Sequence, residues 1–312
     1  MIIWALLVWL TITGGYAGLC NPVLFLLNGA LTSVLILAAT LTLTERPAGW
    51  LDAGLLAMAA AAAVSGWAAH VWAVKAAIWL LFWSVYRLAG RWPAAHLHRA
   101  ALFTLPFYLT IIPFLPENQN VMAFHLVALT LLALPATGLF FIYLLPPVIY
   151  LLVFWLESWG GLLALALGGS VYILRYFKAT PTWSALWGAP AALAALLVPA
   201  SFNWRLTFWA DAWRGFVSAP ALGIGPWQFW RLDRWSHGHN LPLTTAAEGG
   251  LLGLAALGVL GYALIKRWPG LPVYAQAVTG ALLFWSIFDE PLMFLGSGCI
   301  FALSLGGQHD RT

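Results

Sequence analysis

The fold of this 312-residue chain is organised around residues 236–267, which read SHGHNLPLTTAAEGGLLGLAALGVLGYALIKR. Here a polar segment passes into an apolar run, Leu251–Ile265, that has the composition of a membrane-spanning helix. Thr245 and Glu248 have the spacing of a capping box, in which the threonine accepts from a first-turn N–H and the glutamate reaches back to the cap. This pattern predicts a helix that begins near Ala246 and enters the membrane.

The composition of the whole chain is that of a membrane protein. Hydrophobic residues make up 62% and charged residues only 8%, whereas about a quarter of the residues in a soluble domain are charged. We expect an all-α fold, with one polytopic integral membrane domain over residues 1–312 and about twelve helices of about 20 residues that cross the bilayer. The predicted helices are 2–19, 22–43, 50–65, 67–88, 100–116, 120–135, 138–156, 159–177, 183–200, 246–265, 271–288 and 290–306.

Charged residues sort onto alternate ends of these helices. Lysine and arginine mark the cytoplasmic side of a membrane protein, and that side receives Arg46, Arg87, Arg91, Arg99, Arg175, Lys178, Lys266, Arg267 and Arg311. The other side receives the loop 201–245 together with Glu117, Glu157, Asp289 and Glu290. The sorting predicts that both termini are cytoplasmic and that the loop, between the ninth and tenth helices, is extracytoplasmic. Because most basic residues lie in short inter-helix loops, the net charge of +4 indicates no nucleic-acid partner.

The arginines that break this sorting all lie in the extracytoplasmic loop: Arg205, Arg214, Arg231 and Arg234. A long loop tolerates basic residues on that side, so a solvated segment is one interpretation. The same loop carries His237 and His239 close to a predicted helix start, where backbone N–H groups and the helix dipole favour an anion. We therefore expect the loop to bind an anionic substrate.

Residues 205–218 have the pattern of a helix that lies in the membrane interface. At about 100° per residue, the apolar side chains share one face, and Asp211 and Arg214 share the other. Arg205 falls within the apolar face, where a charge without a partner is costly and usually indicates a function. Arg214 lies on the polar face, where solvation is the simpler interpretation.

The loop offers no clear ligand set for a metal. Metal-dependent hydrolysis uses two or three His, Asp or Glu side chains at ligand spacing, and metal-dependent polytopic glycosyltransferases resemble one another in an acidic motif of the first external loop. Here that loop, residues 14–21, contains no acid. Arginine, by contrast, binds phosphate in bidentate geometry, and histidine acts as a base near neutral pH. This combination favours group transfer from a diphosphate donor with neither a metal nor a cofactor.

Sequence motifs in this region occur in a specific order. Arg205 and Trp209 have the spacing R-x-x-x-W, residues 220–229 match P-x-x-G-x-G-x-x-x-F, residues 239–253 match H-N-x-x-L-x-x-x-x-E-x-G-x-x-G, and residues 289–292 read DEPL. Together they resemble the motifs of the O-antigen ligase/polymerase superfamily of integral membrane glycosyltransferases, which includes bacterial protein O-oligosaccharyltransferases. The sequence departs from the family at Trp159, where many members carry an arginine.

The resemblance implies a metal-independent transferase in the bacterial inner membrane. Such an enzyme moves a glycan from undecaprenyl diphosphate to an acceptor at the outer face of that membrane. By position, His239 is implied as the catalytic base and Arg205 as a contact of the donor diphosphate, while Asn240 and Glu248 order the loop. We expect His239 and Arg205 to lie outside the packed helices.

The remaining polar residues of the loop are candidates for substrate binding: Arg214, Arg231, Arg234 and His237, of which the last has no family counterpart. The acceptor stays open among the lipid A-core of lipopolysaccharide, a growing polysaccharide and a protein, because ligases, polymerases and protein-glycosylating enzymes share the motifs. A secondary transporter is the alternative from another class. It needs ionisable residues within the membrane, and Lys75 and His125 are the candidates. A structural scaffold is a third option, in which His239 and the loop arginines are replaceable.

Overall fold

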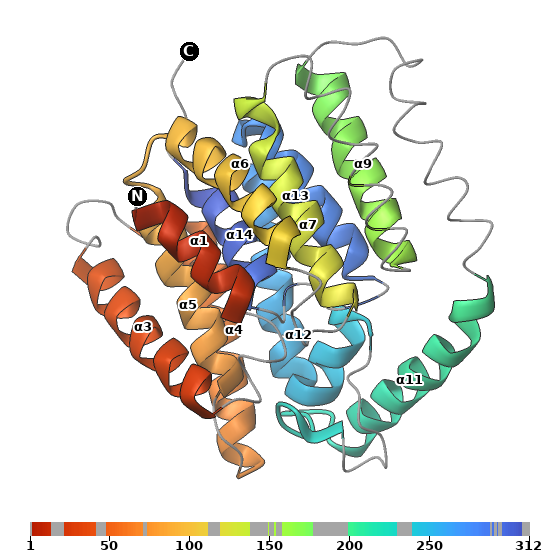
Figure 1. Ribbon diagram of the computed structural model, residues 1–312. Coiled ribbons are helices and arrows are strands. Elements are labelled where there is room, and N and C mark those ends of the chain that lie inside the picture. Colours follow the sequence, from red (N-terminus) through yellow and green to blue (C-terminus); the bar gives the residue numbers. More distant parts are fainter. Residues whose placement is uncertain are drawn as a thin grey trace.

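The computed structural model describes residues 2–13, 22–41, 48–70, 74–111, 119–137, 158–176, 199–229, 239–287 and 295–307, with the single residues 149, 153, 289 and 292. Its elements, in chain order, are α1 (Ile2–Thr13), α3 (Pro22–Leu41), α4 (Trp50–Ala68), α5 (Val74–Ala89), α6 (Ala94–Ile111), α7 (Gln119–Ala133), η3 (Leu134–Ala136), α9 (Trp159–Tyr176), α11 (Pro199–Ser218), α12 (Leu241–Arg267), η5 (Trp268–Gly270), α13 (Val273–Trp285) and α14 (Leu295–Gly306) (Figure 1). For these residues the prediction of an all-α fold is confirmed.

Several of these helices are suited to a membrane. Trp50–Ala68, Gln119–Ala136 and Leu241–Gly270 are the described helices that are long and apolar enough to cross a bilayer. Shorter apolar helices include 160–175 and 273–285. The described part of the chain therefore has the character of a membrane protein, while the predicted helix 138–156, apart from residues 149 and 153, and residues 183–198 lie outside the described residues.

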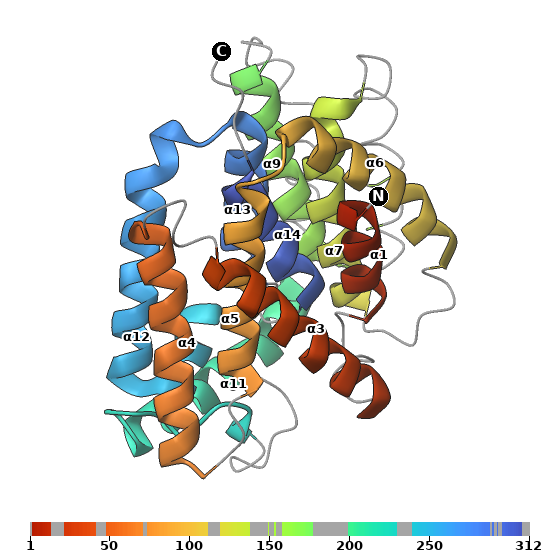
Figure 2. The same cartoon turned by 90° about the vertical axis from the view of Figure 1, so that its left-hand side faces the viewer.

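The helices form one bundle, with α11 set apart at its lower end (Figures 1 and 2). Within the bundle α4 packs on α5 and α12, α13 packs on α9 and α14, and α6 packs on α7. The C-terminal ends of α5, α9 and α12 lie at the upper end, opposite α11. Their last turns carry Arg87, Arg175 and Lys266, so these three basic turns lie at one end of the bundle.

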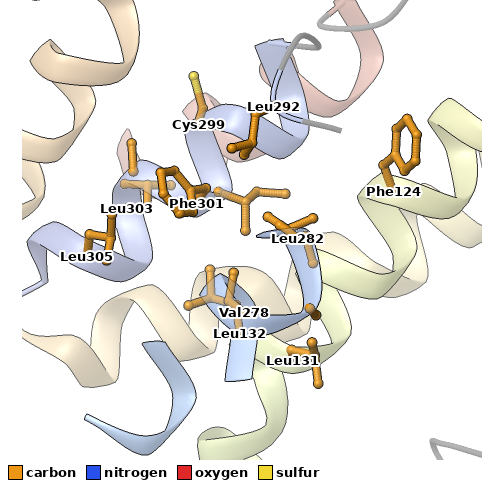
Figure 3. Close-up of a cluster of buried hydrophobic side chains, with 14 of the residues drawn as sticks. Phe124, Leu131, Leu132, Val278, Leu282, Leu292, Cys299, Phe301, Leu303 and Leu305 are labelled. Carbon is orange, nitrogen blue, oxygen red and sulfur yellow. The ribbon is translucent and has the colours of Figure 1, made fainter. Parts of the chain in front are cut away.

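The core contains apolar side chains from α7, α13 and α14 that are fully buried. Figure 3 shows this cluster, which includes Leu131, Val278 and Leu303. Helices in a membrane associate through close packing, and small residues allow that approach. A Cβ placed on Gly298 of α14 would lie 2.0 Å from the ring of Phe82 of α5. The close packing of these two helices therefore requires a glycine at this position.

A buried ion pair joins α4 to α5. Arg87 Nη1 lies 3.5 Å from Asp52 Oδ2, with both side chains 1% exposed. Trp83 Nε1 donates to Asp52 Oδ1 at 2.9 Å, and the backbone N–H of Gly49 donates to Oδ2 at 2.8 Å. Because each Asp52 oxygen has a partner, the pair fixes the first turn of α4 against the last turn of α5.

Candidate functional site

The helix that follows His239, α12, is broken. Within α12, Gly250 has φ 59° and ψ −152°, which are not helical values. Residues 220–225 cross this break and bond to it: Ile224 N–H donates to Ala247 O at 2.8 Å, and Leu251 N–H donates to Pro220 O at 2.8 Å. Backbone groups freed within a membrane helix need partners, and the crossing segment supplies them.

Glycines are required where the two segments cross. Gly223 has φ 73°, and a Cβ on it would lie 2.2 Å from the carbonyl carbon of Glu248. A Cβ on Gly250 would lie 2.5 Å from the carbonyl carbon of Ala221. The glycines of the P-x-x-G-x-G and E-x-G motifs thus have a physical reason in this chain, namely close backbone approach at positive φ.

The start of α12 differs from the prediction. Asn240 is the N-cap, its Oδ1 accepting from Leu243 N–H at 2.9 Å, and the helix begins at Leu241. The predicted capping box is therefore wrong, because Thr245 and Glu248 are buried inside the helix. Asparagine before a first-turn proline is itself a strong helix start, and it precedes the threonine in the chain.

The same asparagine ties α12 to the end of α13. Asn240 Nδ2 donates to Ile287 O at 2.8 Å, and Leu241 N–H donates to Ser286 O at 2.8 Å. These bonds fix the residues just before α12 beside those just after α13. As a result His239 and Asp289 lie side by side.

His239 and Asp289 form a hydrogen-bonded pair. Nδ1 of the imidazole lies 3.2 Å from Oδ1 of the carboxylate, and the side chains are 12% and 3% exposed. His239 has φ 48°, a conformation that few non-glycine residues adopt. The Phe208 ring of α11 lies 5.0 Å from the imidazole. His239 precedes the first residue of α12 and is partly buried, between Phe208 of α11 and Asp289.

Arg205 belongs to the same site. Its side chain is partly buried on α11. Burial lowers the pKa of the Arg205 guanidinium below its ordinary value, and the negative charge of Asp289 raises that pKa in part. Arginine stays protonated in proteins, so the Asp289 carboxylate interacts with a cation as well as with the imidazole. Its two neighbours come from segments that are far apart in the sequence.

The surface of α11 differs from the predicted two-faced pattern. Asp211, expected on the polar face, is 1% exposed, whereas the apolar Trp213 and Val217 are 57% and 58% exposed. Arg214 forms an ion pair with Asp211 and keeps 69% of its side chain exposed. The helix therefore has a third side that faces the protein and includes Asp211 and Arg205. Arg231, Arg234 and His237 lie outside the described residues.

Glu248 has a partner that sequence reasoning does not supply. Its Oε2 forms a buried ion pair with Lys75 of α5, and its Oε1 accepts from Trp227 N–H at 2.9 Å. The Ser65 hydroxyl of α4 donates to the Glu248 carbonyl. The sequence shows an ionisable residue in each of two apolar helices, Lys75 and Glu248, and each needs a partner when buried. It does not show that the two residues are partners of each other.

Two hollows lie near these residues. A pocket of about 30 Å³ is lined by Ser65, Lys75, Glu248 and the residues around them, and it has room for one or two waters. A larger, apolar pocket of about 430 Å³ lies along α12 and is lined by Leu241, Leu257, Leu260, Gly261, Leu264, Ile265, Trp268, Pro269, Leu283 and Leu292. Its first and last lining residues are close in sequence to His239 and Asp289.

Across the residues that the structure describes, no group of three His, Cys, Asp or Glu could hold a metal ion. No family model matches the chain, and no curated protein matches it.

Proposed function

We propose that this protein is a membrane glycosyltransferase that moves a glycan from an undecaprenyl diphosphate donor to an acceptor, without a metal or a cofactor. The motif resemblance to O-antigen ligases and polymerases motivates this proposal. The observation that carries it is the hydrogen bond of 3.2 Å between His239 Nδ1 and Asp289 Oδ1, beside the partly buried Arg205. Each of these residues belongs to a different motif: Arg205 to R-x-x-x-W, His239 to the motif that begins H-N, and Asp289 to DEPL.

The pair can act as a base of defined orientation. When Nδ1–H donates to the carboxylate of Asp289, the proton is held on Nδ1 and the second ring nitrogen, Nε2, is the acceptor. A carboxylate behind the imidazole also stabilises the imidazolium that forms when Nε2 takes a proton. His239 is thus suited to deprotonate an acceptor hydroxyl.

Bond making and breaking balance without another reactant. The acceptor oxygen forms a bond to the anomeric carbon of the glycan as His239 takes its proton. The bond from that carbon to the diphosphate oxygen breaks, and the electron pair leaves with undecaprenyl diphosphate. Arg205 stabilises the negative charge of this leaving group, because a guanidinium binds phosphate oxygens in bidentate geometry.

The apolar pocket along α12 fits a donor with a long hydrocarbon chain. Leu241 follows Asn240 directly, and Leu292 lies just beyond Asp289, so one end of the pocket adjoins the polar site. A lipid-linked donor has this arrangement, with a polar head at the reacting atoms and an apolar chain beside it. We place the undecaprenyl chain in this pocket.

The proposed location is the bacterial inner membrane, with the site on the extracytoplasmic side, both termini cytoplasmic and about twelve crossings. The lipid A-core of lipopolysaccharide is the first acceptor to test. A growing polysaccharide and a protein are the alternatives on the same chemistry.

One experiment tests the function directly. Purified protein in lipid nanodiscs is incubated with a lipid-linked glycan and each candidate acceptor, and the products are identified by mass spectrometry. We expect glycan transfer that is lost in His239→Ala and in Arg205→Ala, with incomplete rescue by Arg205→Lys because a point charge cannot make the bidentate contact. Arg214→Ala should cause a smaller loss, since Arg214 is exposed and already paired. Near-normal transfer by His239→Ala removes the catalytic role.

A secondary transporter is the second candidate, and one observation favours it. Transporters often place ionisable residues beside a broken helix, and Lys75 and Glu248 lie beside the break at Gly250. Against this, the two charges neutralise each other and the pocket beside them holds about 30 Å³. His125 is buried with Nδ1 3.1 Å from the Tyr108 hydroxyl. Uptake of labelled solutes into proteoliposomes, without glycan transfer, would support the transporter.

A further inference from the structure

Lys75 lies outside the motifs that carry His239, Asp289 and Arg205, yet its side chain contacts the helix that begins directly after His239 and Asn240. It lies in the first turn of α5, and its ammonium group forms an ion pair with Glu248 of α12 across 173 residues of sequence. The side chains are 9% and 5% exposed. Glu248 lies about 10 Å along α12 from Leu241, where the helix begins. The residue that Lys75 contacts is thus about two helical turns from the start of α12.

Glu248 divides its carboxylate between two parts of the molecule. Oε2 pairs with Lys75, and Oε1 accepts from the backbone N–H of Trp227 at 2.9 Å. Trp227 has φ 61°, which a tryptophan rarely adopts, and the Lys75 ammonium group lies 5.7 Å from the centroid of its ring. The ion pair thus orients the carboxylate that holds Trp227 in an unusual backbone conformation.

Residues 225–229 carry this restraint to α11. The backbone N–H of Gly225 donates to Glu248 O at 3.1 Å. Phe229 is buried in a small cluster with Ala212 of α11 and Ala247 of α12. α11 also carries Arg205 and packs on α12 directly, so residues 225–229 provide a second link between Arg205 and the start of α12.

Stability alone does not account for such a pair. Replacing a buried ion pair by apolar residues is often neutral or stabilising, and ionisable residues within a membrane protein usually indicate a function. What the pair provides here is a fixed geometry between the α4–α5 hairpin, the break in α12 and residues 225–229. Displacement of a reacting group by about 1 Å can lower a rate by about 10²-fold.

We propose that Lys75 and Glu248 are positioning residues, which hold residues 225–229 and thereby align Arg205 with His239. This inference rests on the proposed glycan transfer, but its structural part does not. Lys75 acts through Glu248, Glu248 acts through Trp227, and neither touches the reacting atoms. The pair is therefore expected to affect turnover and not the affinity for the acceptor.

The test compares Lys75→Met, Glu248→Gln and the double variant Lys75→Met/Glu248→Gln, which removes both charges and avoids an unpaired buried ion. Lys266→Met, an exposed lysine of α12, is the matched control. The first readout is amide hydrogen exchange of Gly225 and Trp227 in nanodiscs. We expect faster exchange at these amides in all three variants of the pair, with α13 unchanged. Wild-type exchange at these amides in Lys75→Met and the double variant overturns the proposal whether or not the protein transfers glycan.

The second readout is transfer kinetics per folded molecule. We expect each single variant to lose about 10²-fold in kcat with little change in the KM for the acceptor. The double variant should lose about the same, because the residues act as one unit, whereas independent roles multiply to about 10⁴-fold. Wild-type kcat in folded Lys75→Met or in the double variant overturns the positioning role. If the wild-type protein transfers no glycan but exchange changes as expected, the proposed function fails and the restraint on residues 225–229 stands.

Discussion

The hydrogen bond between His239 and Asp289 can be tested by changing a single atom, one carboxylate oxygen of Asp289. In Asp289→Asn the side chain keeps its shape but loses its negative charge and one acceptor oxygen. Asp289 is 2% exposed, so water does not readily replace it as a partner of Nδ1. A hydrogen bond to a charged group contributes about 1.5–3 kcal/mol, which corresponds to about 10- to 150-fold in rate.

We therefore expect Asp289→Asn to lower kcat by about 10- to 150-fold. His239→Ala removes the base itself and should cost about 10²–10⁴-fold. The double variant should lose less than the product of the two single losses, because the carboxylate acts in part through the imidazole. The assay is glycan transfer from a lipid-linked donor, followed by mass spectrometry and expressed per folded molecule.

Asp211→Asn is the matched control for this prediction. Asp211 is also a buried carboxylate in an ion pair, but it pairs with Arg214, whose side chain is 69% exposed, and not with an imidazole. Asp211→Asn should transfer glycan at close to the wild-type rate per folded molecule. Wild-type turnover by Asp289→Asn refutes the orienting role, and an equal loss in Asp211→Asn shows that the effect is not specific to the site.

Other predictions address the metal, the topology and the break in α12. Transfer should survive EDTA, because arginines hold the donor diphosphate; loss of turnover that a divalent ion restores would contradict this. A cysteine in place of Arg175 should be shielded from an impermeant thiol reagent in intact cells and one in place of the exposed Thr207 labelled; labelling at position 175 refutes the topology. Gly223→Ala should destabilise the protein by roughly 2–6 kcal/mol through strain and overpacking. Gly258→Ala, whose Cβ meets nothing within 4 Å, should instead stabilise it by about 0.5–1 kcal/mol in thermal unfolding experiments.

Much of the fold could be predicted from the sequence because it depends on local composition and spacing. Long apolar runs predict helices, and the described residues form helices whose basic last turns, in α5, α9 and α12, lie at one end of the bundle. The pattern predicts a helix start near Ala246, whereas the helix begins at Leu241. The exact first residue could not be chosen from pattern alone, because Asn240 and Thr245 both fit an N-cap.

The partners of the ionisable residues were decided only by the tertiary structure. Asp289 is 50 residues from His239, and Lys75 is 173 residues from Glu248. The sequence indicates that each of these charges needs compensation when buried, but many opposite charges satisfy that need equally well. Which one lies within reach depends on how α5, α12 and α13 pack, and that packing depends on the shapes of apolar side chains that local patterns do not encode.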